Sequence, residues 1–501
     1  MRIKDVIVIG AGPAGSAMAT LLAEEGYSVL LLEKGVFPRD KVCGDFVSPK
    51  GLLHLKKLGC YEEIASRGYT PIKQASVYLN GSKLFEGNLP HVPGYPPFAH
   101  AVPRNDLDEI LFRRAQDAGA VTIEECQVVG FHTTPTMVCV EAQKAGRRRR
   151  FAGRVIIGAD GANSVVARFA DLTMNDARYV FPSIRGYCRG LSFEQALLFV
   201  DEDFFPGFGW IFPVSGDLSN VGVGMVKETL GKHRISLKDF FRKFESFIKS
   251  MASKNGKVVE IDSIKGWPIK SYGGARRNFF ERGLLIGEAA CFVDPISGEG
   301  IPLALESAEL GFDTLKLAFD RGDFTANLLS DYERRWKERW DPDFKVSDLV
   351  VSLIRNRYLA KLWIQSFRVM GMTALRDKNY AHTIGGIMAG LIPNREGFSP
   401  EIFIKSLLHA PPFWLEAFDI RTRHTFFDSL TRGIEWFSWE LGVGRDLLND
   451  FEWFAAWASE VNQKQRELFK ILGSAAPSTL RTVPARKYLA AKVETMSPKR
   501  L

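Results

Sequence analysis

The chain has 501 residues, 46% of them hydrophobic and 25% charged, which is the ordinary balance of a globular protein with room for more than one domain. Its formal net charge of +8 suits an anionic partner, but no basic run is long enough to indicate a nucleic-acid groove, so we expect no nucleic acid. The six cysteines lack the close spacing of zinc sites and disulfide frameworks, so we expect reduced thiols and no metal. The N-terminus lacks a signal-peptide pattern, and no uninterrupted apolar stretch reaches the roughly 20 residues of a spanning helix, which predicts a cytoplasmic protein.

The N-terminal residues predict a βαβ unit around a glycine-rich turn. Residues 5–9 are a β-branched apolar run of the kind buried in a parallel sheet, residues 10–15 read Gly-Ala-Gly-Pro-Ala-Gly, and residues 29–32 return as a second strand. In such a unit the first glycine allows a tight turn, the second leaves room for a pyrophosphate, and the third lets the helix approach the strand. Glu33 ends the second strand, where its carboxylate is placed to accept hydrogen bonds from a ribose. The unit predicts a dinucleotide-binding domain without choosing between FAD and NAD.

Two later segments have a similar character. Residues 155–157 are a buried apolar run that leads into Asp160 and Gly161, and residues 284–286 lead into Gly287-Glu288. They resemble the paired motifs of the flavoprotein hydroxylase superfamily, which is shared by flavin halogenases and geranylgeranyl reductases. The resemblance implies FAD as the cofactor, with the carboxylate of the late motif at the ribityl chain and that of the middle motif shaping the same cleft. Glu288 replaces the usual aspartate, and a small shift can absorb its extra methylene.

Three further segments resemble the geranylgeranyl reductase family, which includes menaquinone reductases. They are residues 41–49 (KVCGDFVSP), 208–213 (FGWIFP) and 294–301 (DPISGEGI), and the resemblance covers residues 1 to 330. It implies hydride transfer from reduced flavin to one carbon of an alkene in a lipophilic, prenyl-type substrate, with protonation of the other carbon. No second glycine motif offers a resident nicotinamide site, so the reductant must be external: NADPH, reduced flavin or a ferredoxin-like carrier protein.

The candidate site residues follow from these segments. Arg104, at the start of an expected helix, resembles the superfamily's cofactor-contacting arginine, and the helix expected after Gly300 can direct its N-terminal amides at electron-rich flavin atoms. The candidate cofactor contacts are Gly10, Gly12, Ala14, Gly15, Glu33, Lys34, Cys43, Gly44, Arg104, Asp160, Gly161, Gly287, Glu288, Gly298, Gly300 and Ile301.

The candidate catalytic residues are Cys43, Trp210 and Lys73. Cys43 follows Glu33 by ten residues, where the superfamily's chain passes the flavin, so its thiol could donate the proton; a structural cysteine is the alternative. Phe208, Trp210 and Phe212 alternate along an expected strand and share one face, where they either line an apolar channel or pack in a sheet core.

Lys73 belongs to the alternative function. Residues 70–73 (TPIK) resemble the segment that carries the catalytic lysine of some flavin halogenases, where this lysine intercepts hypohalous acid. A halogenase or monooxygenase acting on an aromatic or natural-product substrate is therefore the rival, although a surface lysine at a strand start explains Lys73 as simply. The halogenase motif W-x-W-x-I-P has only Trp210 here. A non-catalytic flavin scaffold is disfavoured by the intact glycine turn.

The expected fold is α/β. A Rossmann-type FAD-binding domain (residues 1–73, 97–175 and 265–327) is interleaved with a β-sheet substrate domain (74–96 and 176–264) whose strands include 74–79, 196–200 and 220–225. Residues 328–474 are expected to be helical and rich in aromatic residues, followed by a basic tail at 475–501.

Residues 352–372 mix apolar and basic side chains in the manner of an interfacial helix. We therefore expect this segment to be a lid over a lipophilic substrate or a peripheral docking surface on a membrane. An amphipathic helix that simply packs on its own core is the plainer alternative.

Overall fold

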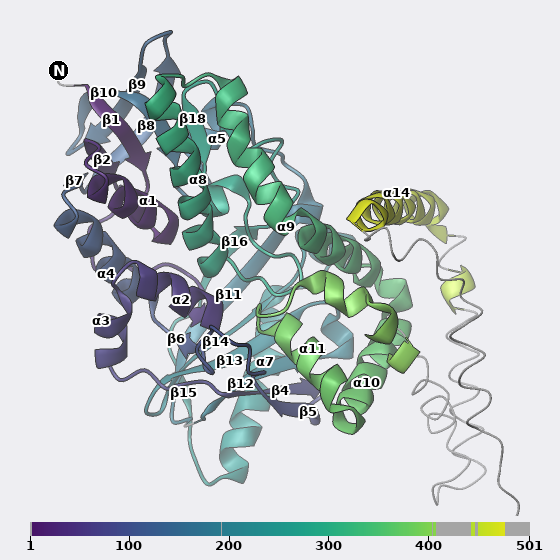
Figure 1. Ribbon diagram of the computed structural model, residues 1–501. Helices are drawn as coiled ribbons and strands as arrows, with labels where there is room; N and C mark the ends of the chain where they lie inside the picture. The colour runs from purple at the N-terminus through teal and green to yellow at the C-terminus, as the bar shows by residue number, and fades with distance from the viewer. Residues whose placement is uncertain (1–2, 192, 403, 407–441, 446–448, 476–501) are drawn as a thin grey trace, which may run out of the picture.

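The computed structural model describes residues 3–191, 193–402, 404–406, 442–445 and 449–475 (Figure 1). Two large sheets organise this part of the chain. In the first sheet β1, β2, β7, β10 and β18 run parallel, while β17 and the β8–β9 extension are antiparallel. Its strands are β1 (Lys4–Ile9), β2 (Val29–Leu32), β7 (Val121–Ile123), β8 (Cys126–Thr133), β9 (Val138–Lys144), β10 (Arg147–Gly158), β17 (Phe279–Phe280) and β18 (Gly283–Leu285).

The parallel strands of this sheet end at one edge. Ile9 lies beside Leu32 and Gly158, and Gly158 lies beside Leu285. The residues that follow each strand, which include the glycine turn and the later motifs, are therefore gathered at the carboxyl edge, where doubly wound sheets bind nucleotides. The sequence prediction of a Rossmann-type parallel sheet is confirmed.

The second sheet is mostly antiparallel and contains the strands predicted at 74–79, 196–200 and 220–225. Its order is β15 (Glu260–Ile261), β11 (Val180–Arg189), β14 (Leu218–Gly224), β13 (Phe208–Ser215), β12 (Gln195–Val200), β4 (Gln74–Leu79) and β5 (Ser82–Asn88), with β16 (Lys265–Lys270) also paired to β11. A separate two-stranded antiparallel ribbon is formed by β3 (Phe46–Val47) and β6 (His100–Ala101). In the sequence these two strands flank β4 and β5 of the second sheet.

Helices cover both sheets (Figure 1). The N-terminal helix α1 packs on β1 and β2, and α4 and α8 pack on α1. On the second sheet, α7 buries Phe240, Phe244 and Ile248, spaced four residues apart, against β11 and β14. The helices are α1 (Pro13–Glu24), α2 (Pro49–Lys57), α3 (Tyr61–Ser66), α4 (Arg104–Asp117), α5 (Val165–Phe169), α6 (Lys227–His233), α7 (Leu237–Lys254), α8 (Ile301–Arg321), α9 (Ala326–Ile354), α10 (Ala360–Arg376), α11 (Lys378–Met388) and α14 (Phe451–Ala475). Short 3-10 turns are η1 (Ala177–Tyr179), η2 (Glu202–Phe204), η3 (Gly287–Ala290), η4 (Arg357–Leu359) and η5 (Asn394–Phe398).

The C-terminal region is helical throughout most of its described part, as predicted. Residues 407–441 and 476–501, which hold three of the tryptophans and nearly all of the expected basic tail, lie outside the described residues. The prediction that residues 352–372 form one continuous helix is wrong, because α9 ends at Ile354, a 3-10 turn follows, and α10 begins at Ala360. Arg355, expected on a basic face, is instead buried among carboxylates.

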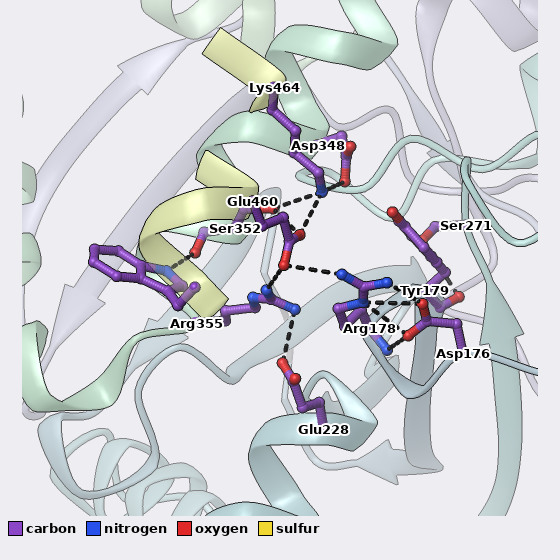
Figure 2. Close-up of polar contacts among 11 residues, drawn as sticks. Asp176, Arg178, Tyr179, Glu228, Ser271, Asp348, Ser352, Arg355, Glu460 and Lys464 are labelled. Carbon is purple, nitrogen blue, oxygen red and sulfur yellow. Dashed lines mark hydrogen bonds and ion pairs between the residues drawn. The ribbon is translucent and has the colours of Figure 1, made fainter. Parts of the chain in front are cut away.

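Ion pairs fix α14 to the rest of the protein (Figure 2). Glu460 of α14 pairs with Arg355 at the end of α9 and, at 3.0 Å, with Arg178 of η1. One turn further along α14, Lys464 contacts Asp348 of α9 at 2.8 Å. The Arg355 side chain is only 3% exposed, so removal of a partner would leave a charge in a poorly solvated place.

No helix among the described residues is both long enough and apolar enough to cross a membrane. No group of three or more histidine, cysteine, aspartate or glutamate side chains in the described part of the chain is arranged to hold a metal ion.

Candidate cofactor and substrate site

The glycine turn after β1 has the geometry that a bound pyrophosphate requires. Gly10 has a φ of +94°, and a Cβ on Gly15 would lie 1.9 Å from the Gly10 carbonyl oxygen, so both positions need glycine for the turn and its helix to fit together. A Cβ on Gly12, by contrast, would meet only the Arg104 guanidinium, at 3.8 Å. Gly12 therefore leaves open space at the N-terminus of α1, where backbone amides favour an anion.

Glu33 ends β2 and braces this turn. Its Oε2 accepts a hydrogen bond from the Ala11 amide at 2.8 Å, and its Oε1 accepts one from the Gly35 amide at 2.9 Å. The carboxylate is thus held rigidly at the carboxyl edge of the sheet. It lines the same cavity as Gly12, so its remaining lone pairs are available to ribose hydroxyls.

Arg104 begins α4 and is fixed in a bidentate ion pair. Its Nε and Nη2 donate to the two carboxylate oxygens of Asp108 at 2.6 and 2.7 Å, and Arg39 reaches the same carboxylate at 3.1 Å. Burial alone would lower the pKa of Arg104, but the neighbouring Asp108 carboxylate acts in the opposite direction. The net pKa is raised, so the guanidinium stays charged. The structure therefore places a fixed positive charge beside the open side of the glycine turn.

The two later carboxylates have different surroundings. Asp160 accepts hydrogen bonds from the Ser164 hydroxyl at 2.5 Å and from the Val165 amide at 2.6 Å, so it satisfies the first turn of α5, whose N-cap residue is Ser164. Burial raises its pKa, although these hydrogen bonds oppose the rise. Glu288 forms an ion pair with Lys41 at 3.0 Å, which joins the late motif to the loop before Cys43.

Three of the segments singled out in the sequence meet at one buried amide. Asn220 of β14 donates from Nδ2 to the Cys43 carbonyl oxygen at 2.9 Å and to Asp45 Oδ2 at 2.7 Å, while its Oδ1 accepts from the Trp210 indole at 2.9 Å. Tyr187 of β11 donates to the same Asp45 oxygen at 2.6 Å. The loop that carries Cys43 is therefore tied to the aromatic strand of the second sheet.

The aromatic residues of β13 share a face, as the alternation predicts. The ring centroid of Trp210 lies 6.2 Å from that of Phe208 and 6.4 Å from that of Phe212. The ring centroids of Phe212 and Phe46 are 4.9 Å apart. All four side chains border one cavity.

This cavity has a volume of about 1600 Å³, larger than the ~300–1,000 Å³ typical of a pocket for one small ligand. It runs from the glycine turn past Cys43 and Trp210 to the space between the second sheet and the helices α10 and α11. Its far part is mainly apolar, and its walls there include Val77, Leu198, Phe208, Met370, Ala374 and Ile384. The space is sufficient for a dinucleotide and a second, apolar molecule.

The structure brings nearly all of the candidate residues together. Every candidate cofactor contact except Gly15 and Gly287 borders this cavity, as do the candidate catalytic residues Cys43 and Trp210. Gly15 and Gly287 pack behind the turn: a Cβ on Gly287 would lie 2.8 Å from the Ala14 side chain. Lys73 is exposed at the start of β4 and is not among the lining residues.

Sequence reasoning missed Asn220 and Tyr187 and gave Asp45 no role. The only local signal was Asp45 itself, an acidic residue inside the segment around Cys43. The partners of Asp45 come from two strands of the second sheet, and a single sequence does not reveal which strand residues face that loop.

Comparison with known proteins agrees with this arrangement. Residues 4–339 match the FAD binding domain family. A digeranylgeranylglycerophospholipid reductase of Methanopyrus kandleri is 31% identical over 357 residues, which are 68% of this chain and 84% of the relative. Among solved structures, a geranylgeranyl bacteriochlorophyll reductase-like protein of Thermoplasma acidophilum has a TM-score of 0.65 at 20% identity and matches 83% of this chain and 98% of its own. The flavin-dependent halogenase CmlS has a TM-score of 0.59 at 21% identity, over 87% of this chain and 70% of its own, so the fold is shared across chemistries.

The match to the FAD binding domain family includes the glycine turn and the two later motifs at the carboxyl edge of the first sheet. The match to the Methanopyrus kandleri reductase covers most of both chains. The chain therefore belongs to the geranylgeranyl reductase family of FAD-dependent oxidoreductases.

Proposed function

We propose that this oxidoreductase reduces carbon–carbon double bonds of a lipophilic, prenyl-type substrate. The observation that carries the proposal is the cavity, because one continuous space joins the glycine turn to an apolar chamber beneath α10 and α11. The name of the Methanopyrus kandleri relative describes action on a phospholipid with geranylgeranyl chains, which fits such a chamber.

The cofactor residues in this proposal are those that border the cavity near α1. Gly12 and the α1 N-terminus receive the pyrophosphate, Glu33 holds the ribose, and Arg104 stands beside the phosphates with a fixed charge. Lys41 and Glu288 close the cleft on the ribityl side as an ion pair. Bound FAD, once reduced by an external donor, supplies the hydride. NADPH, free reduced flavin and a ferredoxin-like protein are the donors to be compared.

The protein's own task is to position the alkene, exclude water and supply a proton. Trp210 and the neighbouring aromatic rings wall the passage between cofactor and substrate chamber. Cys43 lies at this passage, and its Sγ is the proton donor to the alkene carbon. Burial raises the pKa of the Cys43 thiol, which keeps the proton on sulfur until the neighbouring carbon accepts it. Cys43→Ala should retain FAD and flavin reduction and lose turnover, whereas Cys43→Ser should retain part of it.

The helices α10 and α11 form the lid of the chamber in this proposal. Phe367, Leu375 and Met388 border the cavity and are also 36%, 61% and 46% exposed, so they make an apolar rim. Lys378 and His382 lie at the same rim. Apolar rims with basic residues suit peripheral contact with an anionic membrane, from which a lipid substrate could enter. Liposome flotation at low and high salt tests this contact, and binding that ignores anionic lipid would contradict it.

The alternative function is halogenation or monooxygenation with Lys73 as the catalytic lysine. The exposed position of Lys73, outside the cavity lining, favours the reductase. The two are separated by product masses: the enzyme is incubated anaerobically with reductant and prenyl substrate, and aerobically with halide and aromatic substrate. A gain of two hydrogens supports the reductase, and added oxygen or halogen supports the alternative; Lys73→Met would then abolish the halogenation.

A further inference from the structure

Asp45 is a buried acid in the segment that carries Cys43. Its side chain is 0% exposed and its backbone has a φ of +61°. Oδ2 accepts hydrogen bonds from the Tyr187 hydroxyl and the Asn220 amide, whereas Oδ1 has no hydrogen-bond partner in the described part of the protein. Asp45 borders the cavity beside Cys43 and Trp210. An unpartnered carboxylate oxygen in such a place is costly when ionised, because burial without a hydrogen bond disfavours charge.

The surroundings of Asp45 hold its proton more tightly than water would. Burial raises the pKa of Asp45 to about 6 from an ordinary 3.8, even though the hydrogen bonds from Tyr187 and Asn220 act in the opposite direction. Asp45 and its charged or titratable neighbours influence one another's pKa values. These neighbours are Arg185 and Tyr187 of β11, Arg104 of α4, Tyr69 and Cys43. Asp45 can therefore change its protonation state near neutral pH.

Asp45 and Cys43 are held as one unit. A single Asn220 amide nitrogen donates to the Cys43 carbonyl and to the Asp45 carboxylate, so the two residues keep a fixed relation. They are also electrostatically coupled. Burial raises the pKa of the Cys43 thiol, the Arg104 charge opposes this rise, and the Asp45 charge adds to it. Cys43 is half-buried at the cavity wall, and a thiolate left there after one turnover needs an acid close by before it can act again.

We propose that Asp45 is the positioning acid that reloads Cys43 with its proton after each reduction. The inference rests on the proposed function. In the reduction, one alkene carbon receives the hydride that bound, reduced FAD would supply. The Cys43 S–H bond breaks and its proton joins the other carbon, so the product gains two hydrogens and sulfur keeps the electron pair. The Asp45 O–H bond then breaks, its proton restores the Cys43 thiol, and a solvent proton restores Asp45 when the product leaves the cavity.

The first test needs no substrate. In the FAD-loaded protein, the rate of iodoacetamide alkylation at Cys43 is followed against pH by peptide mass spectrometry for wild type, Asp45→Asn and Asp45→Gly. Asn accepts the same hydrogen bonds and tolerates the left-handed backbone. Loss of the Asp45 charge should lower the alkylation midpoint by on the order of 1 pH unit. Asp45→Gly, which removes the carboxylate at a left-handed backbone position that glycine adopts freely, should lower it as well.

An unchanged or higher midpoint in Asp45→Asn overturns the proposal even if the protein is a prenyl reductase, because Asp45 and Cys43 would then be uncoupled. Asp45→Gly decides the question in the same way if Asp45→Asn does not fold. Asp171→Asn, which changes a carboxylate that is 88% exposed, is the matched control and should behave as wild type.

The second test separates reloading from direct chemistry. With anaerobic substrate, Asp45→Asn should complete a first turnover at the wild-type rate, because Cys43 starts with its proton. Later turnovers should slow by on the order of tenfold to a hundredfold, so that product appears as a burst. A slow first turnover means that Asp45 acts on the substrate or only on the fold, and overturns the reloading role. If the wild-type protein reduces no alkene, the proposed function is contradicted instead. The alkylation experiment then still shows whether Asp45 and Cys43 are electrostatically coupled.

Discussion

The side-chain amide of Asn220 donates a hydrogen bond to the main-chain carbonyl of Cys43 at 2.9 Å, across 177 residues of sequence. The same side chain holds Asp45 and the Trp210 indole, so one buried residue joins the loop that carries Cys43 to the aromatic strand of the second sheet. The position of Cys43 thus depends on the second sheet as much as on its own loop.

Asn220→Ala should therefore destabilise the protein by about 2–3 kcal/mol, because it leaves the indole N–H, a carbonyl and a carboxylate without their buried partner. The measurement is the free energy of unfolding from urea denaturation. Ser219→Ala is the matched control on the same strand, since the buried Ser219 hydroxyl has no hydrogen-bond partner among the described residues and its loss should change stability little. Equal effects of the two substitutions would contradict the bridging role of Asn220.

Gly12→Val should abolish FAD binding without unfolding the protein. The structure has room for a side chain at Gly12 beside Arg104, but that room is where the pyrophosphate would lie. The FAD spectrum of the denatured supernatant measures the bound cofactor, and added FAD should no longer raise the melting temperature. Gly231→Ala, in an open position on α6, should keep FAD. Retention of FAD by Gly12→Val would place the cofactor elsewhere.

The sequence predicted the first sheet well because its information is local. The run at 5–9, the glycine turn and Glu33 are adjacent in sequence, and parallel-strand geometry alone brings the later motifs to the same edge. The partners of Asp45 are not local: Tyr187 and Asn220 lie on two strands whose register and facing side chains follow from packing. The amphipathic pattern of residues 352–372 led to the wrong prediction of an exposed basic face. Arg355 is buried because it pairs with carboxylates from α6 and α14, and the local pattern cannot show these distant partners.

Glu460 should make the docking of α14 sensitive to acid. Burial raises its pKa, but Lys464, Arg355 and Arg178 outweigh burial and hold the pKa at about 2 instead of 4.5. A carboxylate with a lowered pKa stabilises the fold fully above pH 4.5, and this contribution is lost as pH falls toward 2. Glu460→Gln should cost about 2–4 kcal/mol at pH 7, because Arg355 keeps a buried charge with fewer partners.

The free energy of unfolding at pH 7 and pH 3 measures this effect. The difference between wild type and Glu460→Gln should shrink at the lower pH, where Glu460 begins to take up a proton. Glu467→Gln, an exposed glutamate on the same helix, should match wild type at both values. A difference between wild type and Glu460→Gln that grows as pH falls would contradict the ion-pair account.

Ala374→Trp should block the substrate chamber and leave the cofactor in place. Ala374 borders the cavity from α10, far from the glycine turn, so an indole would fill space that a long chain needs. The KM for a long prenyl substrate should rise on the order of tenfold or more, while FAD content stays that of wild type. Ser366→Trp places the same side chain at an exposed position of the same helix and should be neutral. A neutral Ala374→Trp would mean that the substrate does not enter beneath α10.

The most direct measurement of the central claim is an anaerobic single turnover with product mass analysis. FAD-loaded protein is reduced with one equivalent of dithionite and mixed with a prenyl substrate, while flavin absorbance is recorded and the product is weighed by mass spectrometry. The account predicts flavin reoxidation without oxygen and one product molecule, heavier by two hydrogens, per flavin. A flavin that stays reduced until oxygen is admitted, with the alkene recovered unchanged or carrying oxygen or halogen, would contradict it.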